Sequence, residues 1–98
     1  MNSDSTDLNR ALMLDGNAAA GVLAEIFGRE MTASVIACAH CGREGALGSL
    51  LAFGQAMGTV LRCPTCENVL MRIVEAPGTI YLDLRGTAHV RLERVRDA

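Results

Sequence analysis

The sequence predicts a mainly β domain (small α+β) in which one N-terminal helix packs on an antiparallel sheet. One amphipathic helical segment lies in the first third of the chain, several strand-like segments follow, and two cysteine pairs interrupt them. The 98 residues have the length of one domain. We expect a single domain over residues 12–98, preceded by a flexible tail of residues 1–11.

The helical segment lies within "LDGNAAAGVLAEIFGRE", residues 14–30. Asp15 or Asn17 is expected to cap its start, because a short polar side chain can accept a bond from a free backbone N–H. A small-ligand or partner contact is the alternative role for residues 15–17, and capping is preferred. Gly28 can adopt the left-handed conformation that often ends a helix. The apolar residues between these ends form one stripe: Val22, Leu23, Ile26 and Phe27.

After the helix, the pattern becomes that of strands. The expected strands are residues 32–37, 49–53, 59–62, 69–76, 79–85 and 88–95. The second and third form a hairpin through residues 54–58. The last three form an antiparallel meander through turns at Pro77-Gly78 and Gly86. In the last two strands, alternate apolar residues are expected to face inward: Ile80, Leu82, Leu84, Ala88, Val90 and Leu92.

The composition indicates a globular protein with few aromatic side chains. Half of the residues are apolar, yet only Phe27, Phe53 and Tyr81 are aromatic. Aliphatic residues and methionine must therefore fill the core, and a domain of this kind gains much from a cross-link. No apolar run reaches the roughly 18 residues of a membrane span, and the polar N-terminus is unlike a signal peptide. We therefore expect a cytoplasmic protein with no membrane contact, whose thiols stay reduced.

The cysteines follow the pattern C-x2-C-x21-C-x2-C: Cys38, Cys41, Cys63 and Cys66. Two such pairs can supply the tetrahedral thiolate set that Zn²⁺ prefers, and the spacing is close to known zinc-site patterns. The hairpin between the pairs brings its two ends together, so that both pairs reach one edge. We therefore expect one structural Zn²⁺ per chain.

The residues beside each pair fit tight turns. Gly42 can adopt the positive φ that such a turn requires after its second cysteine. Pro64 stiffens the second turn. Glu67 takes the position equivalent to Gly42, while Asn68, the next residue, tolerates the left-handed region better.

These residues, from about 33 to 75, resemble the knuckles of zinc-ribbon domains, which implies a zinc-ribbon-like antiparallel sheet. The whole order of elements, with "LDGNAAAG" before the cysteines and Arg-bearing strands after them, is also similar to an uncharacterised family of small bacterial zinc-ribbon-like proteins. That second resemblance implies a fold and no activity.

Three other interpretations of the cysteines remain open. "CAHC" resembles the motif of thioredoxin-like oxidoreductases, but that chemistry needs a helix after the first cysteine, and three glycines (Gly42, Gly45, Gly48) interrupt the following residues. Rubredoxins, which are iron electron carriers, also resemble this site but pack an aromatic-rich core. Disulfides or idle thiols are the third interpretation, and a reducing compartment argues against disulfides.

We expect no enzymatic activity, because four cysteines leave no open coordination position for water. His40 is expected to be exposed at the tip of the first turn, with its side chain pointing away from the ion. His89 is expected on the polar face of the last strand. The cysteine site is therefore interpreted as structural.

The expected function is that of a protein-interaction or adaptor module, with an unidentified partner or a second copy of the chain. The alternative is a nucleic-acid-binding regulator that uses a C-terminal cluster of Arg85, Arg91, Arg94 and Arg96. The net charge of −2 and the lack of aromatic residues among these arginines make that role less favoured.

Overall fold

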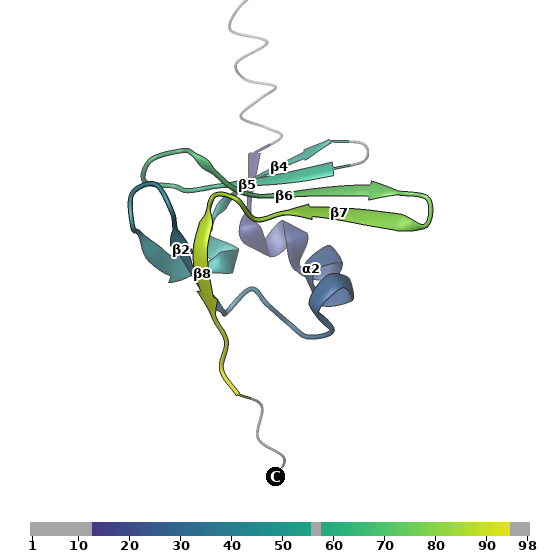
Figure 1. The fold of residues 1–98 in the computed structure, drawn as a ribbon, viewed down its shortest axis with the longest axis horizontal. Helices are drawn as coiled ribbons and strands as arrows, with labels where there is room; N and C mark the ends of the chain where they lie inside the picture. The colour runs from purple at the N-terminus through teal and green to yellow at the C-terminus, as the bar shows by residue number, and fades with distance from the viewer. Residues whose placement is uncertain (1–12, 56–57, 95–98) are drawn as a thin grey trace, which may run out of the picture.

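The computed structural model describes residues 13–55 and 58–94, and the predicted tail of residues 1–11 lies outside this part. Mostly antiparallel strands form two sheets, and one helical segment lies near the N-terminus (Figure 1). The elements in chain order are β1 (Met13–Asp15), η1 (Gly16–Ala19), α2 (Ala20–Phe27), β2 (Val35–Cys38), β3 (Glu44–Ala46), η2 (Leu47–Ser49), β4 (Leu51–Gln55), β5 (Gly58–Arg62), β6 (Val69–Ala76), β7 (Thr79–Asp83) and β8 (Thr87–Arg91). The predicted fold class is confirmed.

The helical segment forms as the sequence predicts, with one 3₁₀ turn before the α-helix. The Asp15 side chain accepts a hydrogen bond from the Asn17 N–H at 3.1 Å. At the other end, Gly28 has φ of 70° and its N–H donates to the Ala24 carbonyl. Leu23 is fully buried, whereas Phe27, at the edge of the predicted stripe, is 36% exposed.

The Asp15–Asn17 segment also fixes the position of the helix on the rest of the chain. Gly16 is buried against η2, and a Cβ at this position would lie 2.1 Å from the Leu47 carbonyl oxygen. A Cβ on Gly48 would in turn lie 2.5 Å from the Asn17 Oδ1 atom. Because neither glycine has a side chain, the Asp15–Asn17 segment packs closely on η2.

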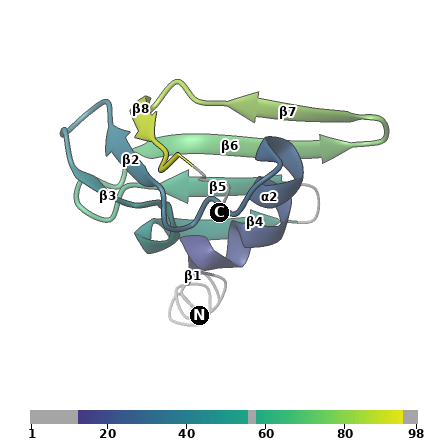
Figure 2. The same ribbon diagram turned by 90° about the horizontal axis from the view of Figure 1, so that it is seen from below.

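The larger sheet has the strand order β1-β4-β5-β6-β7. The register pairs Ala52 with Leu61 and Leu61 with Met71, so these buried side chains share one face. The helical segment covers this face (Figure 2). The predicted hairpin of the second and third strands is β4–β5. At the turn end, β4 continues to Gln55, two residues beyond its predicted end.

The smaller sheet, of order β3-β2-β8, was not predicted. The predicted three-strand meander is wrong, because β6 pairs with β7 but β8 pairs with β2. The chain leaves β7 through a turn in which the Thr87 N–H donates to the Leu84 carbonyl, and Gly86 accepts from the Ala39 N–H. Gly86 lies so close to β6 that a Cβ would be 1.8 Å from the Val69 carbonyl oxygen. This close crossing turns the last strand away from β7 and onto β2.

The inward alternation predicted for the last two strands is therefore only partly correct. Leu82 and Val90 are half-buried and pack on the core. The other four side chains are exposed, with Leu92 reaching 45%: Ile80, Leu84, Ala88 and Leu92. Ile80 lies on the edge strand β7 and Ala88 on β8 of the smaller sheet, whereas Leu84 and Leu92 lie just beyond the ends of these strands.

The core is aliphatic and includes two of the cysteines. Met31 and Met71 are 1% exposed, as expected if methionine replaces aromatic residues as core filling. Cys38 and Cys63 belong to the same cluster and are 2% and 0% exposed. Within the described residues, no helix has the length and apolar character that crossing a membrane requires.

Candidate metal centre

Two turns from different sheets bring the four cysteines together. Cys38 ends β2 and Cys41 lies in the turn that leads to β3, whereas Cys63 and Cys66 lie in the turn between β5 and β6. The two turns lie side by side at one end of the molecule (Figures 1 and 2). The prediction that both pairs reach one place is confirmed.

The two turns have the same hydrogen-bonded conformation. In the first, the Cys38 N–H donates to the Arg43 carbonyl and the Gly42 N–H donates to the Cys38 carbonyl. In the second, the Cys63 N–H donates to the Asn68 carbonyl and the Glu67 N–H donates to the Cys63 carbonyl. Both local sequences thus fold into the same type of turn, although only the cysteines and their spacing are repeated.

Each turn also directs N–H groups at its sulfurs. The His40 N–H donates to Cys38 Sγ at 3.4 Å, and the equivalent Thr65 N–H donates to Cys63 Sγ at 3.4 Å. In the second turn, the Asn68 side-chain amide adds a bond to Cys66 Sγ at 3.3 Å. Such donors stabilise negative charge on sulfur. The sequence pattern indicates only a backbone role for Asn68, and this side-chain contact is seen only in the structure.

The residue after each second cysteine has a positive φ, which is 80° for Gly42 and 63° for Glu67. The expectation for Gly42 is confirmed. In the second turn, Glu67 itself adopts the left-handed conformation, and its neighbour Asn68 does not. A residue with a Cβ is destabilised there by about 1–2 kcal/mol, so the second turn contains local strain.

Replacing Glu67 by Gly should therefore stabilise the metal-loaded protein. The removed strain exceeds the roughly 0.5–1 kcal/mol by which Gly lowers stability through backbone entropy. We expect a gain of up to about 1 kcal/mol, seen as a rise of several degrees in melting temperature. Gly42→Ala is the matched change in the first turn and should destabilise by about 1–2 kcal/mol. Melting temperatures that move in the same direction for both variants would contradict this account.

The four sulfurs fit one tetrahedral ion. All Sγ atoms lie within 4.8 Å of one another. The distance from Cys38 to Cys66 is 3.7 Å and that from Cys41 to Cys63 is 3.6 Å. Zn–S bonds of about 2.3 Å in a tetrahedron place sulfurs about 3.8 Å apart, whereas a disulfide requires about 2.05 Å. The four cysteines are thus positioned to hold one metal ion.

The pKa values of three of the thiols are lowered. Burial raises the pKa of Cys38, but the N–H groups of Cys41 and His40 outweigh it, and the pKa is lowered. The pKa of Cys63 is lowered in the same way: burial raises it, and the N–H groups of Cys66 and Thr65 outweigh burial. For Cys66, the backbone N–H and the side-chain amide of Asn68 lower the pKa.

The fourth thiol behaves differently. The Arg43 N–H lowers the pKa of Cys41, but desolvation and the neighbouring sulfurs of Cys63, Cys66 and Cys38 raise it to about 11. Crowded sulfurs therefore resist a fourth negative charge. A divalent cation at their centre would remove this resistance, since coordinated thiols are deprotonated.

Neither histidine belongs to the four-cysteine cluster. His40 is exposed in the first turn, as expected. His89 is exposed on β8, and its Nε2 atom lies 3.6 Å from Glu44 Oε1 across the smaller sheet. Ala37 on β2 is paired with Glu44 on one side and with His89 on the other, and its small side chain leaves room for this contact.

The structure separates the arginines predicted as one cluster. Arg85 precedes β8 and forms an ion pair of 2.6 Å with Asp83. Arg91 is at the far end of β8, about 13 Å along the strand from Thr87, and its Nη1 lies 4.0 Å from Glu44 Oε1. Arg94 is exposed, and Arg96 lies outside the described residues. Acidic neighbours thus accompany the two arginines nearest β8.

Fold and site together define a small two-sheet β protein with a four-cysteine site for one metal ion. The chain belongs to the DUF6510 family, a family of unknown function whose model matches residues 7–95. Comparisons with curated proteins and with solved structures gave no match. Membership of an uncharacterised family agrees with the resemblance stated for the sequence.

Proposed function

We propose that the protein binds one structural Zn²⁺ through Cys38, Cys41, Cys63 and Cys66, and that it is a zinc-ribbon-like domain. The observation that carries this proposal is the geometry of the sulfurs, which come from two turns of one conformation and have the separations of a tetrahedral thiolate site. Closed four-cysteine sites are typical of structural zinc. The ion would join β2 of the smaller sheet to β5 of the larger one.

The proposal includes the absence of catalysis at this site. Four protein ligands fill the coordination shell, whereas catalytic zinc keeps a position for water or substrate. Two of the sulfurs are buried in the core, which supports a role in holding the fold together. We assign the protein to the cytoplasm, where the four thiols would stay reduced and available to the metal.

The cellular role that we propose is that of an interaction module. Large apolar side chains stay exposed on the β6–β7 hairpin, among them Val74 and Tyr81. Exposed apolar groups that cluster on one element are typical of protein contacts. The nucleic-acid alternative has weaker support, because Arg85 and Arg91 lie next to Asp83 and Glu44.

Elemental analysis of the protein purified from its own host tests the metal. We expect one zinc per chain and no visible absorption, because Zn²⁺ has a filled d shell. A red protein that contains iron and cycles reversibly between oxidation states would instead indicate a rubredoxin-like electron carrier, since a tetrahedral thiolate site accepts either metal. A visible spectrum recorded on the same sample separates the two results.

A further inference from the structure

The outer edge of β7 is free in the described structure. β7 is the last strand of the order β1-β4-β5-β6-β7, and β8 leaves it to pair with β2. None of the described strands therefore pairs with this edge. A free edge presents a row of N–H and C=O groups that can pair with another chain.

The other three edge strands are short or carry basic side chains, whereas β7 carries one charged residue, Asp83, at its end. β1 and β3 have three residues each, and β8 carries exposed His89 and Arg91. β7 has five residues, Thr79–Asp83, with no lysine, arginine or proline, and its ladder with β6 has no bulge. Short length, charge and bulges are the usual protections of an edge.

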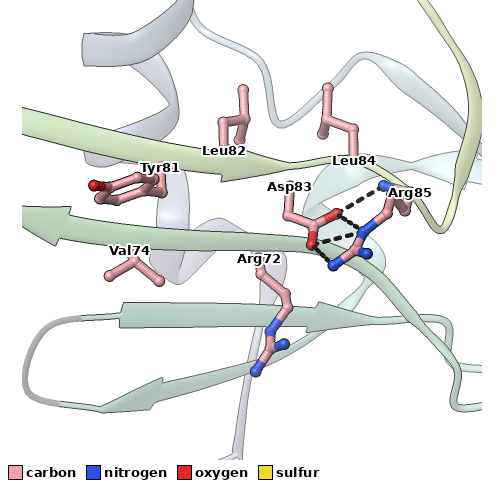
Figure 3. A pocket seen from close by; sticks show the side chains of 7 residues that line it. All are labelled: Arg72, Val74, Tyr81, Leu82, Asp83, Leu84 and Arg85. Atoms are coloured by element: carbon pink, nitrogen blue, oxygen red, sulfur yellow. Dashed lines mark hydrogen bonds and ion pairs between the residues drawn. The ribbon is translucent and has the colours of Figure 1, made fainter.

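Apolar side chains surround the β7 edge. Ile80 and Leu84 are each 37% exposed and Tyr81 is 63% exposed. Figure 3 shows Leu82 and Leu84 on the opposite side of β7 from Tyr81 and Asp83, and Leu82 packs on the core. An open depression of about 610 Å³ lies along the β6–β7 hairpin and is lined by Tyr81, Leu82 and Leu84 together with Arg72, Val74, Asp83 and Arg85. The edge therefore offers both unpaired backbone and apolar surface.

The turn determines which backbone groups point outward. Pro77 and Gly78 form a two-residue turn, and Ala76 and Thr79 face each other beside it. The pair that flanks such a turn is hydrogen-bonded, and bonded pairs alternate with non-bonded ones along the ladder. Tyr81 and Asp83 thus bond to β6, whereas Ile80 and Leu82 direct their N–H and C=O groups away from the sheet.

We propose that two copies of this chain associate through antiparallel pairing of their β7 edges, about a two-fold axis at Tyr81. Ile80 of one copy then exchanges hydrogen bonds with Leu82 of the other, and the two Tyr81 side chains face each other. Thr79 faces Asp83 of the second copy. This is the register that pairs all five residues of β7, and it joins two larger sheets into one.

The edge is self-complementary, which favours a second copy over another protein. No two like charges face each other in this register, because Asp83 meets Thr79. Asp83 also keeps its own counterion, since the Arg85 guanidinium lies 2.6 Å away and lowers the pKa of the carboxyl to about 2. The two-fold pairing uses both β7 edges and leaves the three-residue β1 strands outermost, so the assembly closes at two chains.

The inference names the partner for the interaction role proposed above, but it does not depend on the zinc assignment. No cysteine lies on β7. Measuring the metal content of every sample alongside its oligomeric state separates a failure of the dimer from a failure of the metal site.

Sedimentation of the full chain at about 10–100 µM, a range suited to micromolar association, tests the dimer. Ile80→Pro removes an N–H that no described strand uses, and Ile80→Lys places a charge on the edge. Both variants should be monomers with the metal content of the wild type. Leu92→Lys makes the same change at another exposed apolar residue, 45% exposed and outside β7, and should remain a dimer.

Disulfide trapping tests the register. Directly opposed non-bonded residues have Cα atoms about 4.5 Å apart, within disulfide range, so Tyr81→Cys should cross-link two copies under mild oxidation. Val74→Cys is the control, because β6 strands of the two copies lie three strand spacings apart, about 14 Å. A wild type that stays monomeric, a dimer that survives both Ile80 changes, or equal cross-linking of both cysteine variants would overturn the proposal.

Discussion

Replacing Cys63 by Ser is expected to leave the chain largely unfolded at 25 °C. Cys63 is fully buried in the core and its sulfur is one of the four proposed ligands. Zinc binding at such sites contributes about 10–16 kcal/mol to folding, whereas a whole domain is stable by only about 5–15 kcal/mol. Far-UV circular dichroism, thermal melting and zinc content measure the effect, and a strong chelator should unfold the wild type in the same way.

His40→Ala is the control for this experiment. The histidine lies between two ligands in the first turn, but its side chain is exposed and its bond to Cys38 comes from the backbone N–H. Zinc content and melting temperature should therefore stay as in the wild type. A zinc-free Cys63→Ser protein that melts cooperatively at the wild-type temperature would show that the metal does not hold the fold.

Gly86→Ala should destabilise the zinc-loaded protein by about 3 kcal/mol or more, at the upper end of the range for overpacking. The added Cβ would lie 1.8 Å from the Val69 carbonyl oxygen and 2.8 Å from the Leu70 Cα atom. Both are backbone atoms of β6, so no side-chain rotation relieves the overlap. For a chain of this size, we expect the melting temperature to fall by roughly 12–24 °C.

Gly54→Ala is the matched control within a strand. No atom outside its own neighbours lies within 4 Å of a Cβ at this position on β4. The change should alter the free energy of unfolding by less than about 0.5 kcal/mol. Similar unfolding midpoints for the two variants would show that the crossing of Gly86 over β6 tolerates a side chain.

Local patterns in the sequence were sufficient for the elements that depend on neighbouring residues. The cap at Asp15 and the left-handed Gly28 bound the helix as predicted. β6 occupies residues 69–76, as predicted from its apolar run. The short strands β1 and β3 were missed, because three residues show no alternation that distinguishes a strand from a loop.

The metal site was the most predictable part of the molecule. Its ligands are set by chemistry and by spacing within each turn, so the four cysteines could be named before their positions were known. From residue preference, Asn68 tolerates the left-handed conformation better than Glu67, but it is Glu67 that adopts this conformation. The turn repeats the hydrogen bonds of the first turn, and this requirement outweighs the conformational preference of a single residue.

The sequence alone therefore determined the fold class, the helix and the four-thiol site, since each depends on contacts between residues close in the chain or on a repeated motif. Only the tertiary structure decided the partner of β8 and, with it, the free edge of β7. Both follow from the close approach of Gly86 to the backbone of β6. Such a contact joins residues that are distant in the chain. Its only trace in the sequence is a glycine, and a glycine at this position is equally consistent with an ordinary turn.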